Sequence, residues 1–381
     1  MRSSHKPNMK NYGIFLFLIQ FFFKVISLFL TIYVRIAHYF RPTAYDTSKY
    51  SHTQIIIDAN KPVAEASKMY LSFALDSAEV FGGFRWDVTN IKHENKRRKV
   101  RPLALQQKKL INLTKALHPA YLRIGGTEAD RIVFDDKKYG EKALLLTRKK
   151  WDEVNLFAQK TGLKLYFTVN AGYLERDKNG VWQGTNFEKL LFYSREKGYQ
   201  LDAFELGNEL NAFWFFHGFK NRVTVTQYAE DFRKFKGIVK KYYPHAKVGG
   251  AAALYIPVFG EAFSFVGSFT TRFMKRVKRE ADMFTWHYYP QQARGGSITY
   301  LQAKPQLLFN PINLNDISMW AVKLSKLRDV CSPRSQLWLG EIGNAMYGGQ
   351  SGISDTFEST LWWADALGLM AVNKQQVVVR Q

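Results

Sequence analysis

A regular alternation of short apolar runs with longer amphipathic segments constrains the fold of this chain more than any other feature of the sequence. Segments such as Lys108–Leu117, Trp151–Lys160 and Phe187–Lys197 carry apolar residues three and four positions apart, which predicts helices with one buried face. Between such segments lie eight β-rich apolar runs, which we expect to be buried strands: Met69–Leu75, Ala120–Ile124, Leu163–Val169, Leu201–Leu206, Ala246–Gly249, Ala281–Trp286, Gln336–Leu339 and Gln376–Val379.

Eight strands that are buried on both faces and alternate with helices predict an α/β fold, a parallel (β/α)8 TIM barrel over residues 69–381. An open, doubly wound sheet is the alternative, but no glycine-rich phosphate loop follows the first strand. Thr224 with Gln227, and Asp355 with Glu358, have the spacing of a capping box. We therefore expect a helix to begin directly after Thr224 and another directly after Asp355.

Composition narrows the class of protein and of partner. The chain has 381 residues, of which 46% are hydrophobic and 15% aromatic, so it can bury a large core. A formal net charge of +23 predicts attraction to a polyanion, which can be a nucleic acid, an anionic membrane face or an acidic polysaccharide. Cys331 is the single cysteine, which excludes an intrachain disulfide and a multi-cysteine metal site. No cofactor and no metal is predicted.

The first 40 residues are expected to hold a membrane anchor. Ile14–Val34 is mainly apolar and about as long as a bilayer core requires, roughly 20 residues. Arg2, Lys6 and Lys10 precede it, and no convincing small-x-small cleavage site follows. The interpretation is an uncleaved signal anchor, with a cleaved signal peptide as the alternative. In both cases the rest of the protein is expected outside the cytoplasm, either membrane-anchored or secreted.

Two carboxylates follow apolar strands in the same local pattern. Glu209 comes directly after the fourth predicted strand, in "FELGNELNAF", and Glu341 ends the seventh, in "LWLGEIGNAMYGG". The carboxyl ends of barrel strands share one mouth, so both side chains are expected in it. Retaining glycoside hydrolysis needs such a pair, one as acid and base and the other as nucleophile. Glu205 lies within the strand and is expected to be a structural or surface residue.

Four motifs also carry a family resemblance: "YLRIGGTEAD" (121–130), "FELGNELNAF" (204–213), "FTWHYYP" (284–290), and "LWLGEIGNAMYGG" followed by "SDTF" (337–357). Together they resemble heparanase and its relatives among the β-glucuronidases of glycoside hydrolase family 79, over Ile55–Gln381. The resemblance implies a retaining endo- or exo-β-glucuronidase that acts on acidic polysaccharides such as heparan sulfate, with no nucleic acid as partner. It also implies that Glu209 is the acid and base and Glu341 the nucleophile.

By the same resemblance, Asn208 would contact the sugar hydroxyl beside the reacting carbon. Further positions resemble substrate-contacting positions of the family: Asp76, Thr127, Tyr288 or Tyr289, and the backbone of Gly348 and Gly349. His287 has no histidine or carboxylate nearby in the sequence at ligand spacing, so we expect it to line the pocket or lie in the core rather than bind a metal.

Physical chemistry adds requirements to this assignment. An acid that works near neutral pH needs a raised pKa, and the aromatic residues Phe204 and Phe213–Phe216 are expected to desolvate Glu209. A hydroxyl from Tyr288 or Tyr289 is expected to stabilise ionised Glu341. The carboxyl groups of a retaining pair lie about 5–5.5 Å apart, and those of an inverting pair roughly 6.5–9.5 Å apart.

The sequence stops directly after the eighth predicted strand, so the barrel is expected to be truncated relative to the family. Residues 41–68 are expected to form a linker and one strand, "QIIIDAN" (54–60), which resembles the amino-terminal strand of the family's accessory β-sandwich. Two alternatives to an active glycosidase stand at this point. One is a catalytically weakened glycan-binding relative, and the other is a basic binder of nucleic acid or of a membrane surface.

Overall fold

The computed structural model describes residues 56–86, 97–261, 268–296 and 298–381, together with four single helical positions, Val25, Leu28, Phe29 and Ile32. The predicted anchor, Ile14–Val34, therefore lies outside the described residues except at those four positions. Among the residues that are described, no helix has both the length and the apolar character that crossing a bilayer requires.

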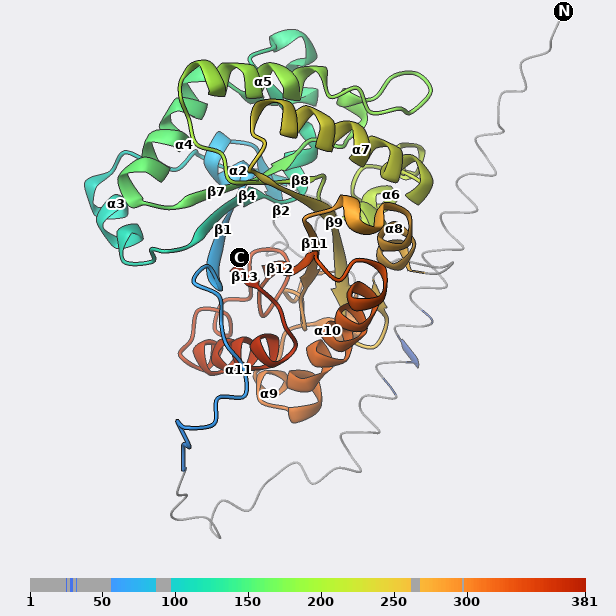
Figure 1. Cartoon of the computed structure of the whole chain (residues 1–381). Coiled ribbons are helices and arrows are strands. Elements are labelled where there is room, and N and C mark those ends of the chain that lie inside the picture. The colour runs from blue at the N-terminus through green and yellow to red at the C-terminus, as the bar shows by residue number, and fades with distance from the viewer. Residues whose placement is uncertain are drawn as a thin grey trace, which may run out of the picture.

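Eight parallel strands close into a barrel, which confirms the predicted fold (Figure 1). The strands are β1 (Leu71–Asp76), β4 (Tyr121–Gly125), β7 (Lys164–Val169), β8 (Ala203–Leu206), β9 (Lys247–Ile256), β11 (Met283–Tyr288), β12 (Gln336–Ile342) and β13 (Val377–Arg380). β1 pairs with both β4 and β13, and β8 pairs with both β7 and β9, so the ring has no open edge. The strand β10 (Gly260–Glu261) adds an antiparallel extension to β9.

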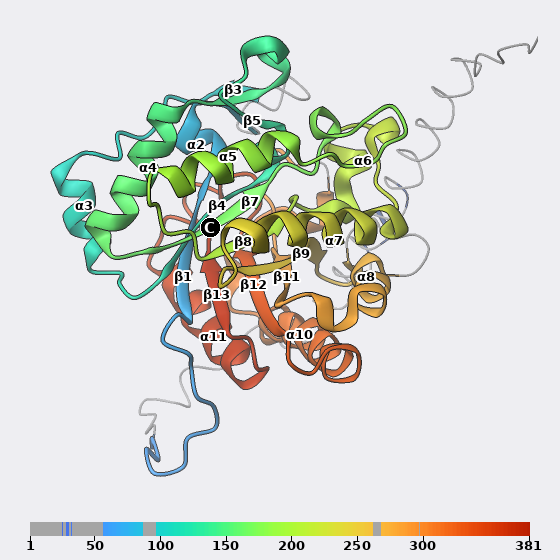
Figure 2. The ribbon, with the colours of Figure 1, turned by 45° about the horizontal axis from the view of Figure 1, so that its top comes forward.

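Helices surround the strands as an outer layer (Figure 2). The longer ones are α3 (Lys108–Lys115), α4 (Arg148–Thr161), α5 (Thr185–Glu196), α7 (Val225–Tyr242), α8 (Phe269–Val277), α10 (Pro311–Cys331) and α11 (Glu358–Val372). The short helices are α2 (Ser77–Phe81), α6 (Phe213–Phe216) and α9 (Pro305–Leu308), and two small sheets pair β2 (Phe84–Trp86) with β3 (Arg97–Lys99) and β5 (Ile132–Phe134) with β6 (Leu144–Leu146). Single 3-10 turns complete the loops: η2 (Thr127–Arg131), η3 (Lys137–Lys142), η4 (Tyr173–Glu175), η5 (Leu210–Ala212), η6 (Phe219–Asn221), η7 (Lys278–Glu280) and η8 (Thr299–Leu301).

The two predicted helix starts had different outcomes. Thr224 caps α7, because its Oγ1 accepts a hydrogen bond from the backbone N–H of Gln227 at 3.2 Å, as expected. The prediction for Asp355 was wrong, since α11 begins three residues later, at Glu358. The side chain of Asp355 turns back and accepts from the backbone N–H of Gly352 at 2.6 Å. It therefore stabilises the preceding loop instead of the helix.

The main apolar core lies between the strands and the helices. Its largest members include the fully buried Trp151, Trp182 and Trp286, and each buried apolar side chain of this size stabilises the fold by roughly 1.5–3 kcal/mol. A second, smaller cluster fills the barrel interior, where Tyr166 packs edge-on against Trp338 with ring centroids 5.3 Å apart. These aromatic side chains close the barrel below the site, so the interior is not a channel.

The predicted sandwich strand at 54–60 is not formed in its described part. Residues 56–60 are irregular or in a turn, and Ile56 and Ile57 are 82% and 84% exposed. Residues 56–60 pair with no strand of the described chain. The segment joins the barrel farther on, where the hydroxyl of Ser67 donates to the backbone oxygen of Gln376 at 2.6 Å. The remnant strand of an accessory β-sandwich that the sequence predicts is therefore not seen in residues 56–60.

Candidate active site

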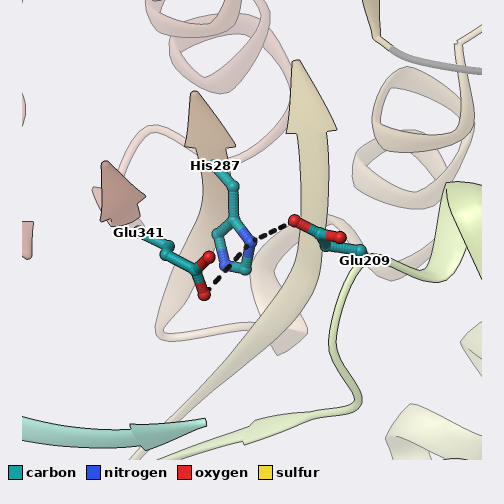
Figure 3. A group of neighbouring side chains, drawn as sticks. All are labelled: Glu209, His287 and Glu341. Atoms are coloured by element: carbon teal, nitrogen blue, oxygen red, sulfur yellow. Dashed lines mark hydrogen bonds and ion pairs between the residues drawn. The ribbon is translucent and has the colours of Figure 1, made fainter. Parts of the chain in front are cut away.

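The carboxyl ends of three barrel strands bring Glu209, His287 and Glu341 together (Figure 3). Glu209 follows β8, His287 lies in β11, and Glu341 lies in β12 at the position paired with His287. Nδ1 of His287 is 3.2 Å from Oε1 of Glu209 and 3.8 Å from Oε2 of Glu341. One oxygen of each carboxylate and one ring nitrogen all lie within 4.8 Å of one another. The two glutamates therefore face each other across the imidazole.

A sharp backbone turn aims Glu209 into the barrel mouth. Gly207 has a φ of 73°, and a Cβ there would lie 2.7 Å from both the Cβ of Ala171 and the Cδ2 of Leu210. Glu209 itself adopts a left-handed conformation with φ 54° and ψ 51°, which few residues other than glycine and asparagine favour. Its backbone N–H donates to the oxygen of Ala252 in β9 at 2.9 Å. The chain thus leaves β8 and is held against the neighbouring strand at the residue that carries the carboxylate.

Glu341 is held on both of its oxygens. The hydroxyl of Tyr289 donates to Oε1 at 2.6 Å, and Nη1 of Arg123 donates to Oε2 at 2.7 Å. These contacts fix the plane of the carboxylate, which is only 7% exposed.

Arg123, in β4, connects most of the site and was not singled out from the sequence. The side chain is fully buried, and its guanidinium donates to Oε1 of Glu205 at 2.8 Å, to Oδ1 of Asn208 at 2.8 Å and to Glu341. Its Nη2 is also 3.3 Å from Nε2 of His287. A buried cation is stable only when it is paired in this way. The available signal was one charged residue inside the apolar run Ala120–Ile124.

Glu205 holds the other side of the Arg123 guanidinium. Of the two roles that the sequence left open for Glu205, a structural residue or a surface residue, the structural one is therefore correct. The hydroxyls of Tyr166, Thr168 and Thr285 donate to its carboxylate, the latter two at 2.7 and 2.9 Å. Burial has the largest single effect and acts to raise the pKa of Glu205, but the attraction of Arg123 and smaller effects, including the hydrogen bonds from Tyr166 and Thr168, together outweigh it and the pKa lies below its ordinary value. Glu205 is therefore the fixed counter-charge of Arg123.

Glu209 has the opposite electrostatic environment. Burial, and then the negative charge of Glu341, raise the pKa of Glu209 well above its ordinary value. Burial, and then the positive charge of Arg123, lower the pKa of His287 well below its ordinary value. Both shifts favour the uncharged forms, that is, a protonated Glu209 facing a neutral imidazole, which suits Glu209 to the role of a proton donor.

The source of the desolvation differs from the prediction. Phe204 points outward and packs against Phe187 and Tyr243 in the helical layer, with ring centroids 5.7 and 6.4 Å away. Phe215, in α6, is 40% exposed. The expected aromatic collar therefore does not enclose Glu209 as a unit.

Of the remaining predicted residues, Asp76 lies beside Gly126 and Thr127, whereas Tyr288 points away from the barrel mouth. Asp76, at the end of β1, caps α2 through its Oδ1, which accepts from Ala78 N–H at 2.8 Å, and its other oxygen lies against Gly126, next to Thr127. Burial raises the pKa of Asp76 to about 7, with the charge of Glu341 adding to the effect. Tyr288 points away from the mouth, because its hydroxyl donates to Oδ2 of Asp316 in α10 at 2.9 Å. Between the two tyrosines left open by the sequence, only Tyr289 contacts Glu341.

Gly348 and Gly349 lie in the loop after β12, with φ angles of 82° and 86°. Within the described ranges, neither backbone N–H donates a hydrogen bond. Two successive unpaired N–H groups in this conformation can form a small anion-binding concavity. This loop is tied to the loop after β11, where Met346 N–H donates to the oxygen of Gln291 at 2.9 Å.

The same three side chains, Glu209, His287 and Glu341, have the spacing to hold a metal ion. The guanidinium of Arg123, 2.7 Å from Oε2 of Glu341, places a positive charge beside that point and disfavours a cation. The arrangement therefore suits proton transfer and nucleophilic attack better than metal binding.

Curated proteins similar to this chain include heparanases and heparanase-like proteins. Heparanase of Bos taurus is 29% identical over 327 residues, which cover 73% of this chain and 57% of that protein. Heparanase-like protein 3 of Arabidopsis thaliana is 27% identical over 322 residues, which cover 79% of this chain and 55% of that protein. The chain thus spans slightly more than half the length of these relatives.

The solved structure of a glycoside hydrolase family 51 arabinofuranosidase from Xanthomonas axonopodis pv. citri matches with a TM-score of 0.54 at 15% identity. The match covers 84% of this chain and 68% of that one, and it supports the barrel fold alone. Residues 52–368 match the family described as "Glycosyl hydrolase family 79, N-terminal domain". Because this match includes every strand from β1 to β12 and both facing glutamates, the chain belongs to glycosyl hydrolase family 79.

Proposed function

We propose that this protein is a retaining glycoside hydrolase that cleaves β-glucuronidic linkages in acidic glycans. The observation that carries the proposal is the approach of the Glu209 and Glu341 carboxylates, with one oxygen of each within 4.8 Å of the other. This approach fits a retaining pair, for which about 5–5.5 Å is usual, whereas an inverting pair at roughly 6.5–9.5 Å leaves room for a water.

In the first step, protonated Glu209 gives its proton to the glycosidic oxygen while a carboxylate oxygen of Glu341 attacks the anomeric carbon. The bond from that carbon to the leaving oxygen breaks, and a covalent glycosyl–enzyme ester forms. In the second step, ionised Glu209 takes a proton from a water molecule, whose oxygen attacks the same carbon and releases Glu341. The raised pKa of Glu209 supports its role as acid in the first step.

The neighbours support these two roles. Tyr289 and Arg123 orient the nucleophile through one hydrogen bond to each of its oxygens. Arg123 also holds Oδ1 of Asn208, which leaves the NH₂ group of Asn208 to donate to the sugar hydroxyl beside the reacting carbon. Asp76, Thr127 and His287 are assigned to the wall of the same sugar pocket.

The acidic character of the substrate is inferred from the loop after β12. The two unpaired backbone N–H groups of Gly348 and Gly349 can receive a carboxylate without a charged side chain. A uronic acid fits such a cradle better than a neutral sugar does. The excess of basic residues over the whole chain, +23, favours the approach of an acidic polysaccharide. We extend the proposal to an extracytoplasmic, membrane-anchored enzyme, on the basis of the apolar segment Ile14–Val34.

The test combines an aryl β-D-glucuronide with heparan sulfate, whose products are sized by chromatography. Wild-type protein is expected to hydrolyse the first, and Glu341→Gln and Glu209→Ala are expected to lose about 10²- to 10⁴-fold in rate. Glu280→Gln, which alters an exposed glutamate paired with Arg233, is the matched control and should retain activity.

Several outcomes would redirect the assignment. Full activity in Glu341→Gln would refute the nucleophile and with it the retaining mechanism. Glycan binding without turnover by the wild type would favour the catalytically weakened relative. Salt-dependent retention on DNA that is unaffected by Glu209→Ala would favour a nucleic-acid binder.

A further inference from the structure

A buried carboxylate beneath the turn of Glu209 has no role in the chemistry described so far. Asp130 lies in η2, the 3-10 turn after β4, and its side chain is fully buried. Its Oδ1 accepts from the backbone N–H of Ala171 at 2.9 Å, directly after β7. Its Oδ2 accepts from the backbone N–H of Asn208 at 2.9 Å, directly after β8. One side chain therefore joins the ends of three neighbouring strands.

The position of this carboxylate bears on the two residues that follow β8. Asn208 is fixed by Asp130 at its backbone and by Arg123 at its side chain. Glu209 comes next and has its own N–H tied to β9. With both amides fixed, the left-handed turn at Glu209 has little freedom to rotate. The carboxylate of Glu209 is thus aimed by contacts that it does not make itself.

Other charged groups near Asp130 do not replace this function. Nε2 of His217 is 4.0 Å from Oδ2 of Asp130, beyond hydrogen-bond distance. Arg176 donates to the oxygens of Ala171 and Gly180 and to Asp231, so it stabilises the loop after β7 from the other side. Of these groups, only Asp130 accepts hydrogen bonds from both loop ends.

We propose that Asp130 is a positioning residue for the acid and base: by accepting both backbone N–H groups, it sets the direction in which Glu209 delivers its proton. This inference rests on the proposed glycosidase function. It predicts a defect that depends on how much the leaving group needs a proton. Poor leaving groups need an aimed acid, whereas strongly electron-withdrawing ones depart as anions without one.

The experiment compares kcat/KM for two aryl β-D-glucuronides, one with a 4-methylphenyl and one with a 2,4-dinitrophenyl leaving group. For each substrate, kcat/KM reports on the steps up to and including the departure of the aryl group. Asp130→Asn keeps the side-chain size but can accept only one of the two N–H groups. The variant is expected to lose about 10- to 100-fold on the poor leaving group and less than about threefold on the activated one.

Glu128→Gln is the matched control, because Glu128 is a buried carboxylate in the same turn that pairs with Arg131 at 2.8 Å. This variant is expected to treat both substrates as the wild type does. Folding is checked by circular dichroism, and Asp130→Glu, which keeps the carboxyl group but displaces it, replaces Asp130→Asn if the latter does not fold.

The outcomes separate this inference from the function on which it rests. An equal loss on both substrates in the folded variant would overturn the positioning role while the glycosidase assignment stands. An unchanged kcat/KM on both would overturn it as well. If the wild type cleaves neither aryl glucuronide, the proposed function is refuted, and this inference is refuted with it.

Discussion

Replacing Arg123 with methionine removes the cation from the barrel interior while leaving a side chain of similar length. Glu205 then stays fully buried without its counter-charge, although three hydroxyls still donate to it. Glu341 keeps its hydrogen bond from Tyr289 and is slightly exposed, so Glu205 carries most of the penalty. Breaking a buried ion pair by removing one partner costs about 3–5 kcal/mol.

Protonation limits that cost and makes it depend on pH. In the variant, Glu205 can bind a proton and so lose its unpaired charge. For a glutamate with an ordinary pKa of about 4.3, the free energy of binding that proton is about 3.7 kcal/mol at pH 7 and about 1 kcal/mol at pH 5. The folded variant then holds a proton that the unfolded chain lacks above that pKa. Its stability therefore falls as pH rises, whereas the wild type, in which the pKa of Glu205 is lowered, has no such loss.

The assay is urea unfolding followed by the fluorescence of the nine tryptophans, at pH 5 and pH 7. Arg123→Met should lower the free energy of unfolding by about 4 kcal/mol at pH 7 and by about 1 kcal/mol at pH 5. Adding Glu205→Gln should restore most of the loss at pH 7. Arg148→Met, which breaks an exposed pair with Asp135, is the control and should cost less than about 1 kcal/mol. A loss that is equal at both pH values, or that Glu205→Gln does not relieve, would refute the reasoning.

Three further predictions follow from contacts of the site. Tyr289→Phe removes the hydrogen bond to Glu341, a bond to a charged group that contributes about 1.5–3 kcal/mol, so kcat/KM on an aryl glucuronide should fall about 10- to 100-fold. Burial raises the pKa of Asp76 to about 7 and that of Asp130 to about 8, so the folded state binds more protons than the unfolded chain. The melting temperature should therefore fall from pH 5 to pH 8, and Asp76→Asn should flatten that slope. Gly126→Ala places a Cβ against Asp76 at a φ of 88° and should lower the free energy of unfolding by more than about 1 kcal/mol in urea titrations, whereas a neutral result would contradict the close packing.

The order and type of the barrel elements were predictable because most of the strands are buried on both faces and stand out as apolar runs. Strand ends were less predictable where small residues weaken the pattern. The fifth run was expected to be Ala246–Gly249, yet β9 continues to Ile256 through glycines and alanines of low β-propensity. Pairing with β8 and β11 extends this strand, and pairing partners cannot be found from local sequence.

The facing glutamates were predictable from a pattern repeated at two strand ends, but the groups that hold them were not. Arg123 was missed because its partners Glu205 and Glu341 lie 82 and 218 residues away. The choice between Tyr288 and Tyr289 depends on which face of β11 points inward. Thr285, His287 and Tyr289 share the inner face, as strand alternation requires. When both faces of a strand are apolar, the sequence does not reveal which set of alternate residues points inward.

The left-handed backbone at Glu209 sets stability and catalysis against each other at a single position. A glutamate in that conformation costs the fold of the order of 1 kcal/mol, which asparagine or glycine would largely recover. Relief of the repulsion from Glu341 would add to the gain. A selection for thermal tolerance alone would therefore tend to replace the residue that we propose as the proton donor. Heat-stable descendants of this chain that keep Glu209 would show that turnover, and not folding, has preserved it.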